Sequence, residues 1–256
     1  MYQLISYIKF LITSTNQHGV HSPFIYNFVT KCLYSKTKHQ AYTKLKQYKQ
    51  ELQTSKAVLE ITDLGEGSKT LDANQRQVSK MAKTSSSSKK DAELLFRLSK
   101  YFKFKTCLEL GTSIGMGTYA FALENTNSQI TTIEGCPNTS AFAQSKLTGK
   151  NIKNVEFIIG NFSDTIPALK QDNYDVIYFD GHHNKLATIQ YFEALLPKVH
   201  NDTIFIFDDI YWSKGMTEAW EYIKNHKSVT VTVDTFHLGF VFFRREQVKE
   251  HFKIRL

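Results

Sequence analysis

The sequence has few cysteines and prolines and no long apolar run. Its three cysteines, Cys32, Cys107 and Cys136, form no Cys-x-x-Cys pair, which argues against a disulfide framework and a zinc knuckle. The apolar segment at residues 1–14 is short and lacks a basic leader and a cleavage site, so we expect a packing helix there rather than a signal peptide or a membrane span. These absences predict a cytoplasmic protein.

Positive charge is concentrated in the first part of the chain. Residues 1–105 hold 18 Lys and Arg against 7 Asp and Glu, a net charge of +11, whereas residues 106–256 hold 14 against 17, a net charge of −3. Residues 39–56 form a lysine-rich helical pattern with few apolar positions, and we expect an exposed basic surface there. Two interpretations stay open, a solvated helical surface and a patch that holds a polyanion such as RNA.

A glycine-rich turn at residues 106–118 is the most informative stretch. The apolar run TCLEL contains Glu109 and is followed by Gly111, Gly115 and Gly117, after which a helical pattern begins at Tyr119. Glycines tolerate positive φ and let a ligand lie against the backbone, while the helix behind them offers free N–H groups. The order GxxxGxG differs from the GxGxxG of dinucleotide-binding folds, which disfavours a dehydrogenase.

This turn resembles motif I of the class I S-adenosylmethionine (SAM)-dependent methyltransferases. About twenty residues later a second predicted strand, residues 129–133, ends at Glu134, whose carboxylate can accept hydrogen bonds from both hydroxyls of an adenosine ribose. A similar glycine pattern at residues 57–70 lacks a strong amphipathic helix after it, so we expect a lid there rather than the cofactor loop.

The rest of the chain alternates predicted strands and helices, ending in two β-rich runs at residues 229–233 and 237–243. Such alternation predicts an α/β fold with a doubly wound, mostly parallel, seven-stranded sheet. The last two strands are joined by only a few residues and must be antiparallel. We expect an N-terminal helical, basic extension at residues 1–88 and the methyltransferase domain at residues 89–256.

Three acids follow two neighbouring predicted strands. Asp180 ends the run YDVIYFD, and Asp208 and Asp209 end the run TIFIFDD. Three converging carboxylates repel one another unless a cation lies between them, and oxygen ligands favour Mg²⁺ or Ca²⁺ over zinc. The other interpretation is that these acids cap helices or pair with Lys185 or Lys214.

Residues 90–245 are similar to the divalent-cation-dependent O-methyltransferases, the family of the catechol and caffeoyl-coenzyme A enzymes. The similarity lies in the runs GNFSDTIPAL, YDVIYFDGHH and FIFDDI. It implies a metal site at Asp180, Asp208 and Asp209, with Asp180 also at the cofactor. It implies that the remaining cofactor residues are Glu109, Gly111, Ser113, Gly115 and Gly117 at the methionine end, Glu134 at the ribose, and Asn161 and Phe162 at the adenine.

Two positions depart from this family. Asp209 stands where catechol-type enzymes have asparagine, and His183 replaces the expected lysine. We expect His183, or else Lys185, to act as the base, because imidazole exchanges protons near neutral pH.

The resemblance implies SAM-dependent O-methylation of a hydroxylated small molecule assisted by Mg²⁺ or Ca²⁺. Two alternatives remain at this stage. One is an RNA-modifying methyltransferase acting on a hydroxylated base, which the basic front part suggests. The other is an inactive binding protein that keeps the methyltransferase fold. The apolar N-terminal helices would also allow a homodimer.

Overall fold

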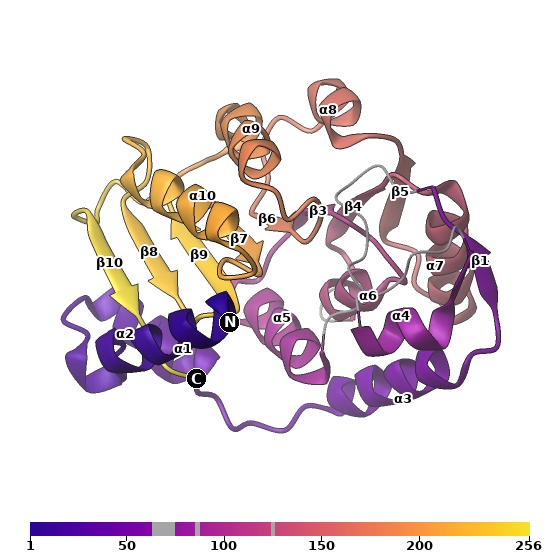
Figure 1. The fold of residues 1–256 in the computed structure, drawn as a ribbon, viewed down its shortest axis with the longest axis horizontal. Helices are drawn as coiled ribbons and strands as arrows, with labels where there is room; N and C mark the ends of the chain where they lie inside the picture. Colours follow the sequence, from indigo (N-terminus) through magenta and orange to yellow (C-terminus); the bar gives the residue numbers. More distant parts are fainter. Residues whose placement is uncertain (63–74, 85–87, 124–125) are drawn as a thin grey trace. The chain divides into compact units, whose positions relative to one another are not determined.

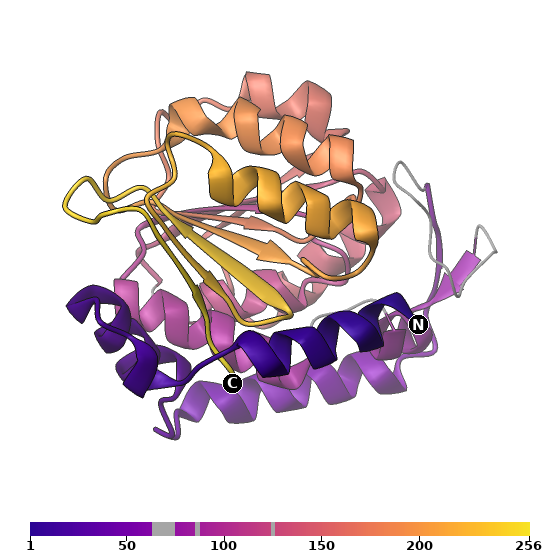
Figure 2. The ribbon, with the colours of Figure 1, turned by 60° about the vertical axis from the view of Figure 1, so that its left-hand side comes forward.

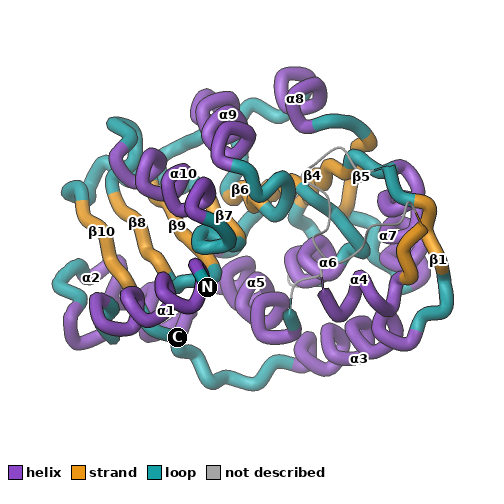
Figure 3. Tube along the Cα trace, in the orientation of Figure 1, coloured by secondary structure: helices purple, strands orange, loops and turns teal. Residues whose placement is uncertain are grey.

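The computed structural model describes residues 1–62, 75–84, 88–123 and 126–256 of the chain. These residues form two compact units, one of residues 36–168 and the other of residues 1–35 together with 169–256. Figure 1 labels the helices and strands, and Figure 3 distinguishes them by type. These units divide the chain after residues 35 and 168. The expected domain boundary between residues 88 and 89 stays a prediction.

The unit of residues 36–168 contains three parallel strands in the order β3-β4-β5. Its longer helices pack around them, and a two-stranded antiparallel pair, β1 with β2, lies apart from these three strands in the hydrogen-bonding pattern. Its elements are α3 (Gln40–Thr54), β1 (Val58–Glu60), β2 (Gln75–Gln77), α4 (Val78–Thr84), α5 (Lys89–Phe102), β3 (Thr106–Leu110), α6 (Met116–Ala122), β4 (Gln129–Glu134), α7 (Pro137–Gly149), β5 (Val155–Ile159), α8 (Phe162–Thr165) and η3 (Ile166–Ala168).

The other unit contains five strands in the order β10-β8-β9-β7-β6. Helices from both ends of the chain belong to it. Its elements are α1 (Tyr2–Thr13), η1 (Gln17–Gly19), α2 (Pro23–Phe28), η2 (Val29–Leu33), β6 (Val176–Phe179), α9 (Lys185–Leu195), η4 (Leu196–Lys198), β7 (Ile204–Asp208), α10 (Lys214–Asn225), β8 (Val231–Asp234), β9 (Leu238–Phe242) and β10 (Glu250–Lys253).

The strand directions confirm the predicted α/β class. Strands β3, β4 and β5 are parallel, as are β6 and β7, while β9 runs antiparallel to both β7 and β8. The predicted closing hairpin is therefore present. One strand was not predicted: β10 pairs in parallel with β8, so the described residues hold eight strands besides β1 and β2, where a seven-stranded sheet was expected. Its sequence, EHFK, is short and polar and carries no strong strand signal.

Strand β9 shows how the sheet of this unit is buried on both faces. Phe240 and Phe242 contact the ring of Phe28, whose centroid lies 5.3 and 5.6 Å from theirs. On the opposite face, a Cβ at Gly239 would lie 2.7 Å from the Trp220 ring of α10, so only glycine fits there. Figure 2 shows α1 and α2 on one side of these strands and α9 and α10 on the other.

Helix α1 forms where the apolar spacing predicted it, but the expected packing face is wrong. Leu4, Ile8 and Ile12 are 60%, 50% and 78% exposed. The helix instead buries Ser6 and Phe10, and the Phe10 ring lies 5.6 Å from that of Phe236. Aromatic contacts on the other side of the helix therefore decided its orientation, which periodicity alone could not reveal. No described helix is long and apolar enough to cross a membrane.

Helix α3 also differs from expectation. We expected few apolar contacts along it, yet Leu45, Tyr48 and Leu52 are buried, and they recur at the spacing of one helical face. Even Lys49 is only 8% exposed. The lid predicted at residues 57–70 lies mostly outside the described residues.

Candidate functional site

The predicted strand, glycine turn and helix are formed by β3, residues 111–115 and α6. Gly111 and Gly115 have φ of 105° and 79°, in the left-handed region that favours glycine. Gly115 is the N-cap residue of α6, and its N–H donates to the carbonyl of Thr112 at 2.9 Å. Gly117 lies inside α6 and is buried. The turn thus places a glycine backbone at a helix N-terminus, as the sequence predicted.

Glu134 joins this turn to the end of β4. Its Oε2 accepts the backbone N–H of Ser113 at 2.8 Å, and its Oε1 accepts the backbone N–H of Cys136 at 3.0 Å. Ser113 itself has a φ of 48°, an uncommon conformation for a residue other than glycine. The structure therefore brings together two of the predicted cofactor residues that lie 21 positions apart. Each carboxylate oxygen has more than one lone pair, so these bonds leave acceptor capacity.

Glu109 lies in the interior rather than on the surface of the turn. It is 1% exposed, and its Oε2 accepts hydrogen bonds from the hydroxyls of Thr118 at 2.5 Å and Thr132 at 2.7 Å. These bonds connect β3 to α6 and β4. The position of Glu109 at the methionine end of a cofactor stays a prediction, and in the structure its carboxylate fixes the elements that carry the turn.

Tyr48 of α3 packs against the turn, a contact that was not predicted. Its hydroxyl donates to the carbonyl of Ile114 at 2.7 Å, and its ring lies 4.9 Å from that of Tyr119. Burial raises the pKa of Tyr48 well above its usual range, so the hydroxyl keeps its proton. A Cβ at Gly115 would lie 3.2 Å from the same hydroxyl. The spacing of Leu45, Tyr48 and Leu52 was the signal that this helix packs inward.

Asn161 and Phe162 follow β5, where the resemblance places the adenine. The side chain of Asn161 caps α8 by accepting the N–H of Ser163 at 3.2 Å, and Phe162 is buried. The N–H of Gly160 donates to the carbonyl of Glu134 at 3.0 Å. This hydrogen bond holds the two strand ends together, whereas contact with an adenine stays a prediction.

The three predicted carboxylates belong to the other unit. Strands β6 and β7 are parallel with Phe179 opposite Phe207, so Asp180 and Asp208 stand at the same edge. The two side chains are close enough for Asp208 to affect the pKa of Asp180. Burial is the main cause that raises the pKa of Asp180 to about 6, and the charge of Asp209 raises it further, while His183 lowers it. The structure therefore brings Asp180, Asp208, Asp209 and His183 close enough to interact.

Asp180, Asp208 and Asp209 provide oxygen donors of the kind a metal ion needs, but the described side chains do not form a complete coordination site. Carboxylate oxygens are the ligands that Mg²⁺ and Ca²⁺ prefer. However, no group of three or more His, Cys, Asp or Glu side chains within the described residues is arranged to hold a metal ion.

The two candidate bases have different surroundings. His183 acts electrostatically on Asp180, and its ring lies 6.4 Å from the Trp212 ring. The Lys185 ammonium instead forms an ion pair with Glu218 at 2.7 Å. The geometry thus favours His183 over Lys185 as the base beside the carboxylates.

Left-handed backbone occurs both at the glycine turn and beside the three carboxylates. Besides Ser113, His182 and Asp209 have φ of 51° and 53°. Residues other than glycine adopt this conformation at a cost, and such positions cluster at functional sites. Three of the six described residues other than glycine with positive φ thus lie at the candidate sites, while Lys103, Asn151 and Phe236 lie elsewhere.

Comparisons with known proteins agree with this geometry. Residues 108–210 match a family model described as a methyltransferase domain. No curated protein matches the chain. Among solved structures, the SAH-bound methyltransferase PaMTH1 from Podospora anserina has a TM-score of 0.60 at 14% identity, covering 88% of this chain and 97% of its own.

Two further structures show the same fold. The O-methyltransferase TomG from Streptomyces achromogenes, in complex with SAM, has a TM-score of 0.57 at 17% identity, covering 81% of this chain and 91% of its own. The O-methyltransferase from Bacillus cereus, in complex with SAH, has a TM-score of 0.54 at 17% identity, covering 82% and 93%. The domain match and the shared fold confirm the methyltransferase prediction.

Proposed function

We propose that this methyltransferase domain transfers a methyl group from SAM to a hydroxyl group of a small molecule. The observation that carries the proposal is the pair of hydrogen bonds from Ser113 and Cys136 to Glu134, which set an acid beside the glycine turn. An adenosyl cofactor needs both features, backbone to lie against and a carboxylate for its ribose hydroxyls. Similar folds bind SAM or SAH in the Streptomyces and Bacillus enzymes.

In this proposal the residues of the turn bind and orient the cofactor. The backbone of Gly111, Ser113, Gly115 and Gly117 lies along its methionine end, and Glu134 accepts the ribose hydroxyls. Asn161 and Phe162 flank the adenine. Fixing the sulfonium in one orientation supplies most of what the reaction requires, because SAM is itself a strong electrophile.

His183 takes the proton of the acceptor hydroxyl. The acceptor oxygen then attacks the methyl carbon in line with the sulfur, a carbon–oxygen bond forms, and the carbon–sulfur bond breaks with its electron pair left on sulfur. We assign the proton to His183 rather than Lys185 because Lys185 is engaged by Glu218. A base works only within hydrogen-bonding reach of the proton, so its neighbours matter as much as its chemistry.

In this proposal Asp180, Asp208 and Asp209 would be the ligands of a divalent cation, Mg²⁺ or Ca²⁺. When bound, such an ion lowers the pKa of a coordinated hydroxyl. Binding requires Asp180 to be ionised, so we expect cation affinity to increase as the pH rises through about 6, the pKa of Asp180.

The test is transfer of a labelled methyl group from SAM to a panel of catechols and other phenols, with an RNA fraction as a separate arm. We expect label in a phenolic acceptor, loss of transfer in Asp180→Asn with SAM binding retained, and normal transfer in the exposed control Asp172→Asn. Undiminished transfer in excess chelator would contradict the cation. Label in RNA alone would contradict the small-molecule acceptor, and SAM binding without any transfer would indicate an inactive binding protein.

A further inference from the structure

A cavity of about 400 Å³ lies in the unit of residues 36–168, between α3, the end of α4 and the start of α5. Four lysines line it, with Gln53 and Ser88 among the polar residues between them. Lys46 and Lys49 come from α3, Lys83 from α4 and Lys89 from α5. None of the residues assigned above to SAM or to the acceptor is part of the lining. Its volume is in the range of small-molecule sites, roughly 300 to 1,000 Å³.

The charged side chains that line this cavity are all lysines. Among the described residues that line it, none is acidic. The nearby acids already have partners, since Glu51 pairs with Lys150 at 2.7 Å and Asp91 accepts the N–H of Ser88 in the capping box of α5. Glu93 lies 3.4 Å from the ammonium of Lys89, an exposed pair of small energetic value. Lys46 and Lys83 form no ion pair with any described residue, so positive charge at the cavity exceeds what the described residues neutralise.

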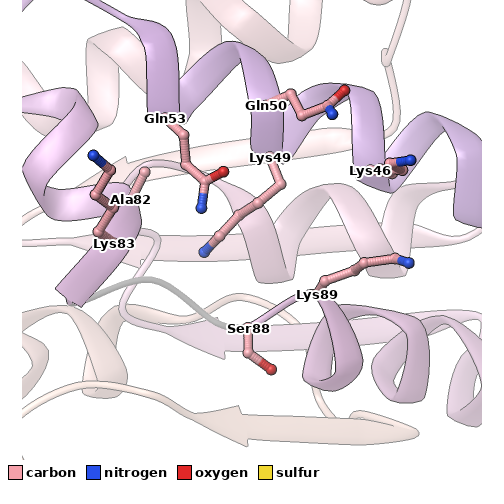
Figure 4. Close-up of a pocket in the computed structure, with 8 residues that line it drawn as sticks. All are labelled: Lys46, Lys49, Gln50, Gln53, Ala82, Lys83, Ser88 and Lys89. Carbon is pink, nitrogen blue, oxygen red and sulfur yellow. The ribbon is translucent and has the colours of Figure 1, made fainter.

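Lys49 is the most informative of the four lysines. It is only 8% exposed, although lysine is among the residues least often buried. Burial lowers the pKa of Lys49, and the charge of Asp91 opposes that shift. Figure 4 shows its ammonium extending from α3 into the space between the helices, above Ser88 and beside Gln53. In the same view the ammonium groups of Lys46 and Lys89 lie on one side of the cavity, from facing helices.

The first turn of α5 adds to this field. The N-terminus of a helix carries partial positive charge and normally attracts acids, but α5 begins with Lys89 and Lys90. Lysines placed against this preference, next to a lysine-lined cavity, are stabilised when an anion binds.

The lining also limits the kind of anion. Ammonium groups suit phosphate oxygens, with which they form charge-assisted hydrogen bonds. None of the described lining residues is aromatic, so these residues offer no platform on which a base can stack. We propose that this cavity binds the phosphate groups of a small molecule that carries a di- or triphosphate, through Lys46, Lys49, Lys83 and Lys89.

The test is calorimetric titration of the full chain with pyrophosphate, with ATP and with a single-stranded RNA oligonucleotide at fixed ionic strength. We expect pyrophosphate and ATP to bind at one site. Each of Lys46→Glu and Lys89→Glu should weaken pyrophosphate binding by about tenfold or more, because a nearby charge is reversed. Lys44→Glu is the matched control: it makes the same change at an exposed position of α3 outside the lining, and should leave binding nearly unchanged.

Thermal denaturation of each variant checks that the fold is kept, and Lys49→Met, which keeps the side-chain volume, tests the buried position separately. No binding of pyrophosphate or ATP at millimolar concentration would overturn the proposal. Equal weakening by Lys44→Glu would reduce the site to general surface charge and would also overturn it. Binding of RNA alone would assign the lysines to a nucleic-acid backbone instead.

Discussion

Glu134→Gln is the sharpest perturbation of the candidate cofactor site, because it keeps the shape of the side chain and removes one acceptor. The carboxylate now accepts two backbone N–H groups, from Ser113 at 2.8 Å and from Cys136 at 3.0 Å. The amide nitrogen of glutamine can only donate, so one of these N–H groups loses its partner. A lost hydrogen bond to a charged group costs about 1.5–3 kcal/mol, and we expect the free energy of unfolding to decrease by that amount.

The same change should weaken SAM binding. A ribose hydroxyl that loses its charged acceptor costs a similar free energy, which corresponds to an increase in Kd of about 10- to 100-fold. Calorimetric titration with SAM measures the affinity, and urea unfolding measures the stability. Glu156→Gln is the control, since Glu156 is an exposed acid of β5 in the same unit. Unchanged SAM affinity in a folded Glu134→Gln protein would refute the assignment, and Glu134→Asp shows whether charge alone restores binding.

Three further variants test the packing beneath and beside the sites. Gly115→Ala should lower the free energy of unfolding by about 1–3 kcal/mol and weaken SAM binding, because a Cβ is strained at a φ of 79° and would lie 3.2 Å from the Tyr48 hydroxyl; an unchanged melting temperature would contradict this. Tyr48→Phe should cost about 1–3 kcal/mol in urea unfolding, since the Ile114 carbonyl loses its donor at 2.7 Å; full stability would mean that water replaces the hydroxyl. Burial raises the pKa of Asp234, so the folded state becomes less stable as the pH rises above the ordinary aspartate range, and the Tyr211 hydroxyl offsets this through its hydrogen bond at 2.7 Å. Tyr211→Phe should therefore lower stability by about 1–3 kcal/mol at pH 7 and by less at pH 4, and an equal loss at both pH values would contradict the reasoning.

The sequence predicted the features that depend on local chemistry. Gly111 and Gly115 predicted a turn with positive φ. The acids at the ends of β4, β6 and β7 predicted the strand ends at which polar groups lie. The structure adds contacts that connect distant parts of the chain. The hydrogen bond from Ser113 to Glu134 is the main example, because it requires two strand ends to lie side by side.

The features that the sequence did not reveal depend on tertiary packing. Tyr48 lies in a lysine-rich helix whose composition suggested exposure, and only its spacing from Leu45 and Leu52 indicated a buried face. The apolar face expected for α1 is exposed because Phe10 packs against Phe236 instead. Threonine hydroxyls from two other elements hold the Glu109 carboxylate in the interior, which was not predicted, while its place at a cofactor stays a prediction. In each case the partner lies far away in the sequence.

The central claim is that the glycine turn and Glu134 form one site for SAM. Calorimetric titration of the 256-residue chain with SAM tests it most directly. We predict saturable binding of one SAM per chain, weakened in Glu134→Gln and unchanged in Glu156→Gln. Absence of any binding heat with millimolar SAM, for protein shown to be folded, would contradict the claim.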